Sequence, residues 1–192
     1  MDTLIDAAFA KDLFSEVKPM QISWERLSKH LSSPNIGKRE GSIFALAKIP
    51  EGPCKNERVE HVSAVVFDID NKVEPFLAIS HVQDKINSAG FKGIIYSTYS
   101  HTVEVPRFRI ILLVDKPIKP ENYRSICKSV AGKLGITDDL DESCLHAARR
   151  YFEPRCHVER KGEFQFIELN GEPIKTDDFL FNTKTISAKK ED

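Results

Sequence analysis

Apolar residues recur with two different spacings between positions 62 and 153, and these spacings predict six consecutive elements. Short runs rich in β-branched and aromatic residues predict strands, whereas apolar residues three or four positions apart predict helices. The predicted order is strand, helix, strand, strand, helix, strand, over residues 62–70, 75–89, 91–102, 107–115, 117–134 and 145–153. In the split βαβ arrangement, such an order gives an antiparallel four-stranded sheet with two helices on one face. We expect the opposite face to be open for a site.

The other segments predict an extension before this core and an appendage after it. Apolar residues at Leu4, Ala8, Phe9 and Leu13 predict one helix, and a second helix is expected to begin at Ser23. Further predicted elements are a polar loop over 37–60 with a short strand at 42–47, an edge strand at 163–169 and a short helix at 176–180. The expected division is an extension over 1–61, a ferredoxin- or RRM-like α+β core over 62–155, an appendage over 156–183 and a polar tail over 184–192.

Composition narrows the class of protein. With 192 residues, 41% hydrophobic residues and a net charge of −1, the chain is long enough for one core and has no global charge that attracts polyanions. Four scattered cysteines without a disulfide framework or a signal peptide favour a reduced, cytoplasmic setting. No apolar run approaches the ~18 residues of a membrane span. We therefore expect a soluble protein in which any nucleic-acid binding depends on a local basic patch.

The strand at 62–70 ends in two carboxylates, Asp68 and Asp70. Alternate side chains of a strand point to the same face, so these two acids project together. Like charges at that separation repel each other, and divalent cations held between them would keep both ionised. We interpret the pair as a metal site; the alternative is a strand that runs out into a solvated acidic turn.

Several other polar groups lie at the ends of the predicted core elements. They are the turn Ser100-His101-Thr102, the pair Arg107 and Arg109, the acidic cluster 138–142, and Arg149-Arg150. Carboxylates hold Mg²⁺ or Mn²⁺, and arginine forks and histidine bind phosphate oxygens. Together these groups are suited to a metal-bound nucleoside triphosphate.

Three of these motifs resemble the archaeo-eukaryotic primase (AEP) superfamily, and specifically the primase-polymerase domains of phage and plasmid replication proteins. The motifs are Asp-Ile-Asp after an apolar strand, Ser-His-Thr at the end of the next, and Arg-Phe-Arg-Ile-Ile-Leu on the third. The resemblance implies an AEP-type core in which Asp68 and Asp70 bind metal and His101 binds nucleotide. For the third acid we favour Asp141, with Asp139 as the substitute and Asp115 less favoured. Tyr99 departs from the family pattern, which has a small residue there.

The implied activity is template-dependent nucleotidyl transfer by two divalent ions, Mg²⁺ or Mn²⁺, expected ~3.5–4 Å apart. In this scheme Ser100, His101, Arg107, Arg109 and Arg149 bind the nucleotide. Lys38, Arg39, Arg155 and Arg160 are assigned to a single-stranded DNA template carrying a primer. The sequence contains no G-x-x-x-x-G-K-[ST] motif, so a helicase would have to come from another domain or protein.

Two alternatives remain open. A haloacid-dehalogenase-type phosphatase would use Asp68 as its nucleophile, with Ser97 or Thr98, Lys133 and Asp138 or Asp139 in its other motifs. A non-catalytic ferredoxin-like module would bind nucleic acid without chemistry, although it would leave the paired acids unexplained and lacks the aromatic strand of an RNA-recognition motif.

Overall fold

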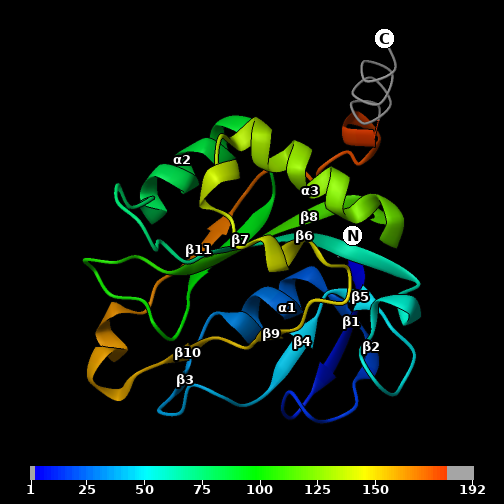
Figure 1. Ribbon diagram of the computed structural model, residues 1–192, viewed down its shortest axis with the longest axis horizontal. Coiled ribbons are helices and arrows are strands. Elements are labelled where there is room, and N and C mark those ends of the chain that lie inside the picture. Colours follow the sequence, from blue (N-terminus) through cyan, green and yellow to red (C-terminus); the bar gives the residue numbers. More distant parts are fainter. Residues whose placement is uncertain (1–2, 181–192) are drawn as a thin grey trace.

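The computed structural model describes residues 3–180, and Figure 1 shows the arrangement of its helices and strands. The strands are β1 (Leu4–Ala10), β2 (Lys18–Ser23), β3 (Asn35–Ile36), β4 (Ile43–Ala45), β5 (Ala47–Lys48), β6 (His61–Ile69), β7 (Gly93–Ser97), β8 (Phe108–Ile118), β9 (Tyr151–Phe152), β10 (Arg155–Cys156) and β11 (Phe166–Leu169). The α-helices are α1 (Trp24–Leu31), α2 (Ile79–Ala89) and α3 (Pro120–Leu134). Short 3-10 helices are η1 (Asn56–Arg58), η2 (Thr137–Asp139), η3 (Glu142–Leu145) and η4 (Val158–Glu163).

The central sheet has five strands in the order β11-β7-β8-β6-β5, with every neighbouring pair antiparallel. Strands β6 and β8 lie in its middle and are buried along most of their length, as their nearly continuous apolar sequences require. The first three predicted core strands are therefore confirmed, and the predicted edge strand forms the outer strand β11. The acid-bearing end of β6 consequently lies inside the sheet and beside β8.

Helices α2 and α3 cover one face of this sheet (Figure 1), as the apolar spacing predicted. Each ends at a glycine in the left-handed region, Gly90 with φ 72° and Gly135 with φ 61°. A glycine adopts this conformation without the Cβ penalty and so closes the last turn. Pro120 opens α3, where the missing N–H is not needed.

The predicted helix at the N-terminus is wrong, because Leu4–Ala10 forms strand β1. This strand pairs with β2 on one side and β4 on the other, within a second sheet of order β2-β1-β4-β9. Ile5 and Ala7 are buried at alternate positions in one apolar cluster. That period-two burial is decided by packing on the central sheet, and the spacing of Leu4 and Ala8 fits a helix equally well. The second predicted helix is confirmed as α1, with Ser23 accepting a hydrogen bond from the N–H of Arg26.

The predicted fourth core strand, 145–153, is also wrong. Its first residue ends the 3-10 helix η3, and only Tyr151–Phe152 is extended, as β9, which pairs with β4 of the second sheet. The N–H of Asp141 bonds to the carbonyl of Asp68, so the chain crosses the end of β6 and does not run alongside it. The edge of β6 is taken by β5. The protein thus has a mixed α+β fold with antiparallel sheets, without the simple four-stranded core.

The face of the central sheet opposite α2 and α3 is not open as predicted. Ile94, Ile111 and Leu113 on this face pack in one apolar cluster with Trp24 and Leu27 of α1. Figure 1 shows α1 and the second sheet lying beneath the central sheet. Space for a site is therefore confined to the end of the sheet where β6 and β7 finish and β8 begins.

The division into 1–61, 62–155 and 156–183 stays a prediction, and the polar tail 184–192 lies outside the described residues. A helical turn follows Thr176 as predicted, but residues beyond 180 are likewise outside this range. Within residues 3–180 no helix has the length and apolar character needed to cross a membrane.

Candidate active site

A cleft lies at this end of the central sheet, between the sheet and the segment that leads into β9 and β10. It collects many of the residues that the sequence assigned to metal, nucleotide or template, namely Asp68, Asp70, Ser100, Arg107, Arg109, Asp141, Arg149, Arg39 and Arg155. Tyr96, Thr98, Tyr99, Phe152 and Glu153 line it as well. Several separate stretches of the chain therefore meet in one depression lined by both acids and arginines.

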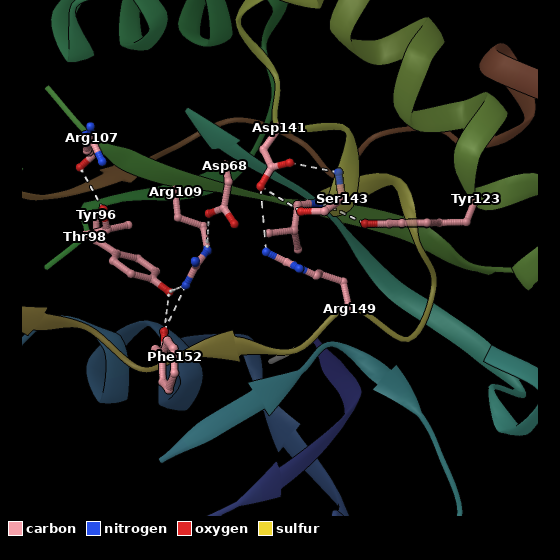
Figure 2. Close-up of polar contacts among 11 residues, drawn as sticks. Asp68, Tyr96, Thr98, Arg107, Arg109, Tyr123, Asp141, Ser143, Arg149 and Phe152 are labelled. Carbon is pink, nitrogen blue, oxygen red and sulfur yellow. Dashed lines mark hydrogen bonds and ion pairs between the residues drawn. The ribbon is translucent and has the colours of Figure 1, made fainter. Parts of the chain in front are cut away.

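Asp68 and Arg109 form the floor of the cleft as a buried ion pair. The two residues lie opposite each other on β6 and β8, and Arg109 lies opposite Tyr96 on β7. Arg109 Nε donates to Asp68 Oδ1 at 2.6 Å, while Nη1 donates to the Tyr96 hydroxyl at 2.8 Å and to the Phe152 carbonyl at 2.9 Å (Figure 2). The guanidinium group also lies over the Tyr151 ring, 4.5 Å from its centroid. Arg109 thus ties the central sheet to the segment across the cleft.

Burial governs the protonation of this cluster. Burial alone would lower the pKa of Arg109, but the neighbouring Asp68 carboxylate and Tyr96 raise it above the ordinary value. Burial also raises the pKa of Tyr96 to about 12, against a smaller opposing effect of Arg109. The Tyr96 hydroxyl therefore keeps its proton at neutral pH and can donate it to the Phe152 carbonyl, 3.3 Å away.

Asp70 follows the end of β6 and is more exposed than Asp68. Its carboxylate lies 3.4 Å from Arg107 Nη1 and 3.6 Å from Lys72 Nζ. Asn71, with φ 42°, turns the chain here and binds the carbonyls of Leu77 and Pro106 through its amide. This turn fixes where the acid-bearing segment leaves the sheet.

Asp141 is the acid that the fold brings beside Asp68 (Figure 2). Its Oδ1 accepts from the Ser143 N–H at 3.0 Å, its Oδ2 accepts from the Ser143 hydroxyl at 2.7 Å, and Arg149 Nη2 lies 3.8 Å from Oδ2. Burial acts to raise the pKa of Asp141, but the bonds from Ser143 and the charge of Arg149 outweigh it and lower the pKa. The carboxylate is thus ionised and oriented at neutral pH.

The other two candidates for the third acid lie elsewhere. Asp139 lines a neighbouring pocket that it shares with Asp70 and Asp141, on the far side of the turn after β6. Asp115 lies on β8, and its Oδ1 accepts from the N–H and hydroxyl of Thr176. Of the three candidates, Asp141 alone lines the cleft with Asp68.

His101 does not line the cleft. It is buried, with 5% of its surface exposed, and its Nδ1 accepts from the backbone N–H of Arg107 at 3.1 Å. Arg160 from η4 donates to the carbonyls of His101 and Tyr99, so the C-terminal segment holds this turn from outside. The histidine therefore supports the loop before β8, while Ser100 beside it reaches the cleft.

Acid should destabilise the protein through His101. Burial, with a smaller contribution from Arg160, lowers the pKa of His101, although Glu163 acts in the opposite direction. Below a pH of about 6.5 the unfolded chain binds a proton that folded His101 resists, so the free energy of unfolding should fall as the pH drops. Urea denaturation between pH 7 and 5 should show a shallower fall for His101→Asn than for the exposed control His81→Asn; equal slopes would contradict this assignment.

The two adjacent arginines 149 and 150 point to different places. Arg149 lines the cleft, whereas Arg150 Nη1 donates to the carbonyl of Leu13. Arg39 and Arg155, which the sequence assigned to template, line the same cleft as the acids. Lys38 and Arg160, assigned with them, are not among the cleft residues.

The donor groups suit a divalent cation, although they are not gathered around one. Among residues 3–180, no set of three or more His, Cys, Asp or Glu side chains is placed to hold a metal ion. Each of the three cleft aspartates is instead paired with an arginine: Asp68 with Arg109, Asp70 with Arg107 and Asp141 with Arg149. Carboxylate oxygens in one cleft are the ligand type that Mg²⁺ and Mn²⁺ prefer, so the chemistry of the residues fits such an ion.

Comparison with known proteins supports the fold. The family model of the VapE N-terminal domain matches residues 41–187. Among solved structures, the AEP domain of the cyanophage S-2L primase-polymerase superposes with a TM-score of 0.50 at 11% sequence identity, covering 92% of this chain and 88% of that one. The search of curated proteins gave no match. The chain is thus similar in fold to an AEP domain, as the sequence motifs implied, and an identity this low says nothing further about activity.

Proposed function

The chain belongs to the VapE N-terminal domain family, and from this membership and its AEP-type fold we propose that it is a primase-polymerase domain. It would join nucleotides to a primer 3′-hydroxyl on a single-stranded DNA template. The observation that carries this proposal is the meeting of Asp68, Asp70 and Asp141 with several arginines in one cleft. Nucleotidyl transfer needs these two groups together, because it handles metal ions and phosphates at one point.

The three aspartates and the residues that hold them have distinct roles in the proposed reaction. Two Mg²⁺ or Mn²⁺ ions bound by Asp68, Asp70 and Asp141 would supply an activated 3′-hydroxyl and charge neutralisation at the triphosphate. Arg109 fixes the position of Asp68, and the Ser143 bonds fix that of Asp141. His101 holds the backbone before β8 and so acts as a positioning residue for Arg107. Prepositioned charge of this kind accounts for much of enzymatic rate enhancement.

A non-catalytic nucleic-acid-binding module is the second candidate, and one observation favours it. Because each acid is already neutralised by an arginine, the cleft does not require metal to avoid repulsion between carboxylates. The phosphatase alternative has less support. Lys133 lies over the rings of Phe91 and Phe179, and the Ser97 hydroxyl accepts from the N–H of Gln165, so these two groups are already engaged and neither lines the cleft.

Incubation of the purified protein with primed single-stranded DNA and labelled nucleotides tests the proposal. We expect extended products that depend on the template sequence, require Mg²⁺ or Mn²⁺ and disappear with EDTA. DNA binding without products under either metal would instead support the binding module. Hydrolysis of a generic phosphate ester, with phosphate trapped on Asp68, would support the phosphatase.

Asp141 should be the third acid of the reaction. Asp141→Asn keeps the shape of the side chain but removes its charge, and we expect a loss of incorporation of about a hundredfold or more. Asp139→Asn is the matched control, since it removes the same charge two residues away, outside the cleft. Initial rates of primer extension measure both variants. A larger loss in Asp139→Asn would transfer the role to that residue.

A further inference from the structure

We propose that Arg39 and Arg155 bind the triphosphate of the incoming nucleotide, in place of the Arg107–Arg109 pair that the sequence suggests. This inference rests on the proposed function and deepens it. Both residues were expected to follow a template strand, yet both line the cleft that contains the three aspartates. They come from the opposite wall, Arg39 from the loop between β3 and β4, and Arg155 from β10, which pairs with β3.

The arginines of the central sheet are already engaged. Arg109 is 8% exposed and makes three hydrogen bonds, to Asp68, Tyr96 and Phe152, beside its contact with the Tyr151 ring. Turning it toward a phosphate would leave Asp68 buried without its partner, which is costly. Arg107 lies within ion-pair distance of Asp70. Arg109 therefore offers no free guanidinium to a triphosphate, whereas Arg107, in a pair whose side chains are 31% and 42% exposed, would have to leave Asp70 to reach one.

Arg39 and Arg155 have no such commitment. Among the described residues neither forms an ion pair with a carboxylate, and Arg155 Nη1 donates a hydrogen bond to the carbonyl of Lys38 at 3.3 Å. Arg155 Nε is buried and has no partner within residues 3–180. Two like charges that line one cleft repel each other, and an anion bound between them removes that repulsion. Planar guanidinium forks bind phosphate oxygens in pairs, so a triphosphate is the chemically matching anion.

Gly41 makes the position of Arg155 possible. A Cβ at residue 41 would overlap the guanidinium carbon and nitrogens of Arg155, so this side chain can lie where it does because residue 41 has none. Gly41→Ala should displace the Arg155 guanidinium while leaving every charge in place. Because φ at Gly41 is 158°, a side chain there also strains the backbone, so this variant has to be compared with one that carries backbone strain alone.

Binding measurements in EDTA isolate the contribution of the arginines, with tripolyphosphate and dATP as probes and a single-stranded oligonucleotide for comparison. Arg39→Ala and Arg155→Ala should each weaken binding of both triphosphates about ten- to hundredfold, the loss of one or two charge-assisted hydrogen bonds. Gly41→Ala should also weaken it. Oligonucleotide affinity should change less than about twofold. The controls are Arg26→Ala, an exposed arginine on α1, and Gly37→Ala, which strains the backbone at φ 114° but whose Cβ meets nothing. Thermal melting checks that each variant folds.

Two results would overturn the inference. One is triphosphate binding that is absent from the wild-type protein or unchanged in both arginine variants. The other is a loss of oligonucleotide affinity that equals or exceeds the loss of triphosphate affinity, which would indicate that these arginines bind the template. Primer extension by the wild-type protein is scored separately. If both variants extend the primer with an unchanged KM for nucleotide, the proposed function is supported and the assignment of Arg39 and Arg155 is wrong. If the wild-type protein extends no primer with Mg²⁺ or with Mn²⁺, the proposed function itself is wrong.

Discussion

Template-dependent incorporation by the Asp68→Asn/Asp70→Asn variant is expected to fall by at least about a thousandfold relative to the wild-type protein. Both amides keep the size of the carboxylates but carry no charge, so they are poor ligands for a hard divalent cation. Each substitution would remove electrostatic stabilisation of the reacting phosphate. Loss of a single such contact lowers the catalytic rate about a hundred- to a thousandfold. Primer extension over a range of Mn²⁺ concentrations measures the loss.

The choice of asparagine follows from the ion pair on the cleft floor. Asp68→Ala would leave Arg109 buried without an acceptor, and a fall in activity could then reflect unfolding. The Asp68→Asn change retains a side-chain oxygen near Arg109 Nε. Oligonucleotide binding by the double variant should remain close to that of the wild type. If activity persists, or if activity and DNA binding are lost together, the metal role of this pair is wrong.

The sequence was sufficient for those parts of the fold that depend on local patterns. The strands β6 and β8 are apolar over whole strand lengths, and Gly90 and Gly135 end their helices for conformational reasons that act within a few residues. The prediction of a helix at the N-terminus was wrong because the spacing of Leu4 and Ala8 also fits a helix. The conformation of this segment is decided by its pairing with β2 and β4. The prediction of an open sheet face was wrong for a similar reason, because the covering helix α1 is distant in sequence from the central sheet.

The acids of the cleft could be identified from sequence because strand alternation places Asp68 and Asp70 on one side. Asp141 was favoured as the third acid because of its place after the second helix. Its closeness to Asp68 results from a crossing of the chain that periodicity did not predict. Arg39 and Arg155 could be recognised as basic but not as cleft residues. The one local sign was Gly41, whose missing side chain leaves room for the Arg155 guanidinium.

Arg109→Leu should lower the free energy of unfolding by about 3–5 kcal/mol, the largest effect on stability that we expect from a single change in the cleft. Leucine fills part of the space and does not satisfy the groups that the guanidinium binds. Asp68 would lose its partner at a position where the aspartate side chain is 15% exposed. The Tyr96 hydroxyl would lose its donor, and the Phe152 carbonyl would keep only the Tyr96 hydroxyl. Urea denaturation at pH 7 measures the change.

Arg107→Leu provides the matched control, because it removes the same group at a neighbouring pair whose side chains are 31% and 42% exposed. Solvent screens such a pair, and its loss should cost about 0–1 kcal/mol. Addition of Asp68→Asn to Arg109→Leu removes the unpaired charge and should recover part of the stability, since an uncompensated buried carboxylate is the main cost. Equal losses in the two leucine variants, or no recovery in the double variant, would show that Arg109 binds the cleft only loosely and remains free to reach a nucleotide. The assignment of the triphosphate to Arg39 and Arg155 would then lose its principal support.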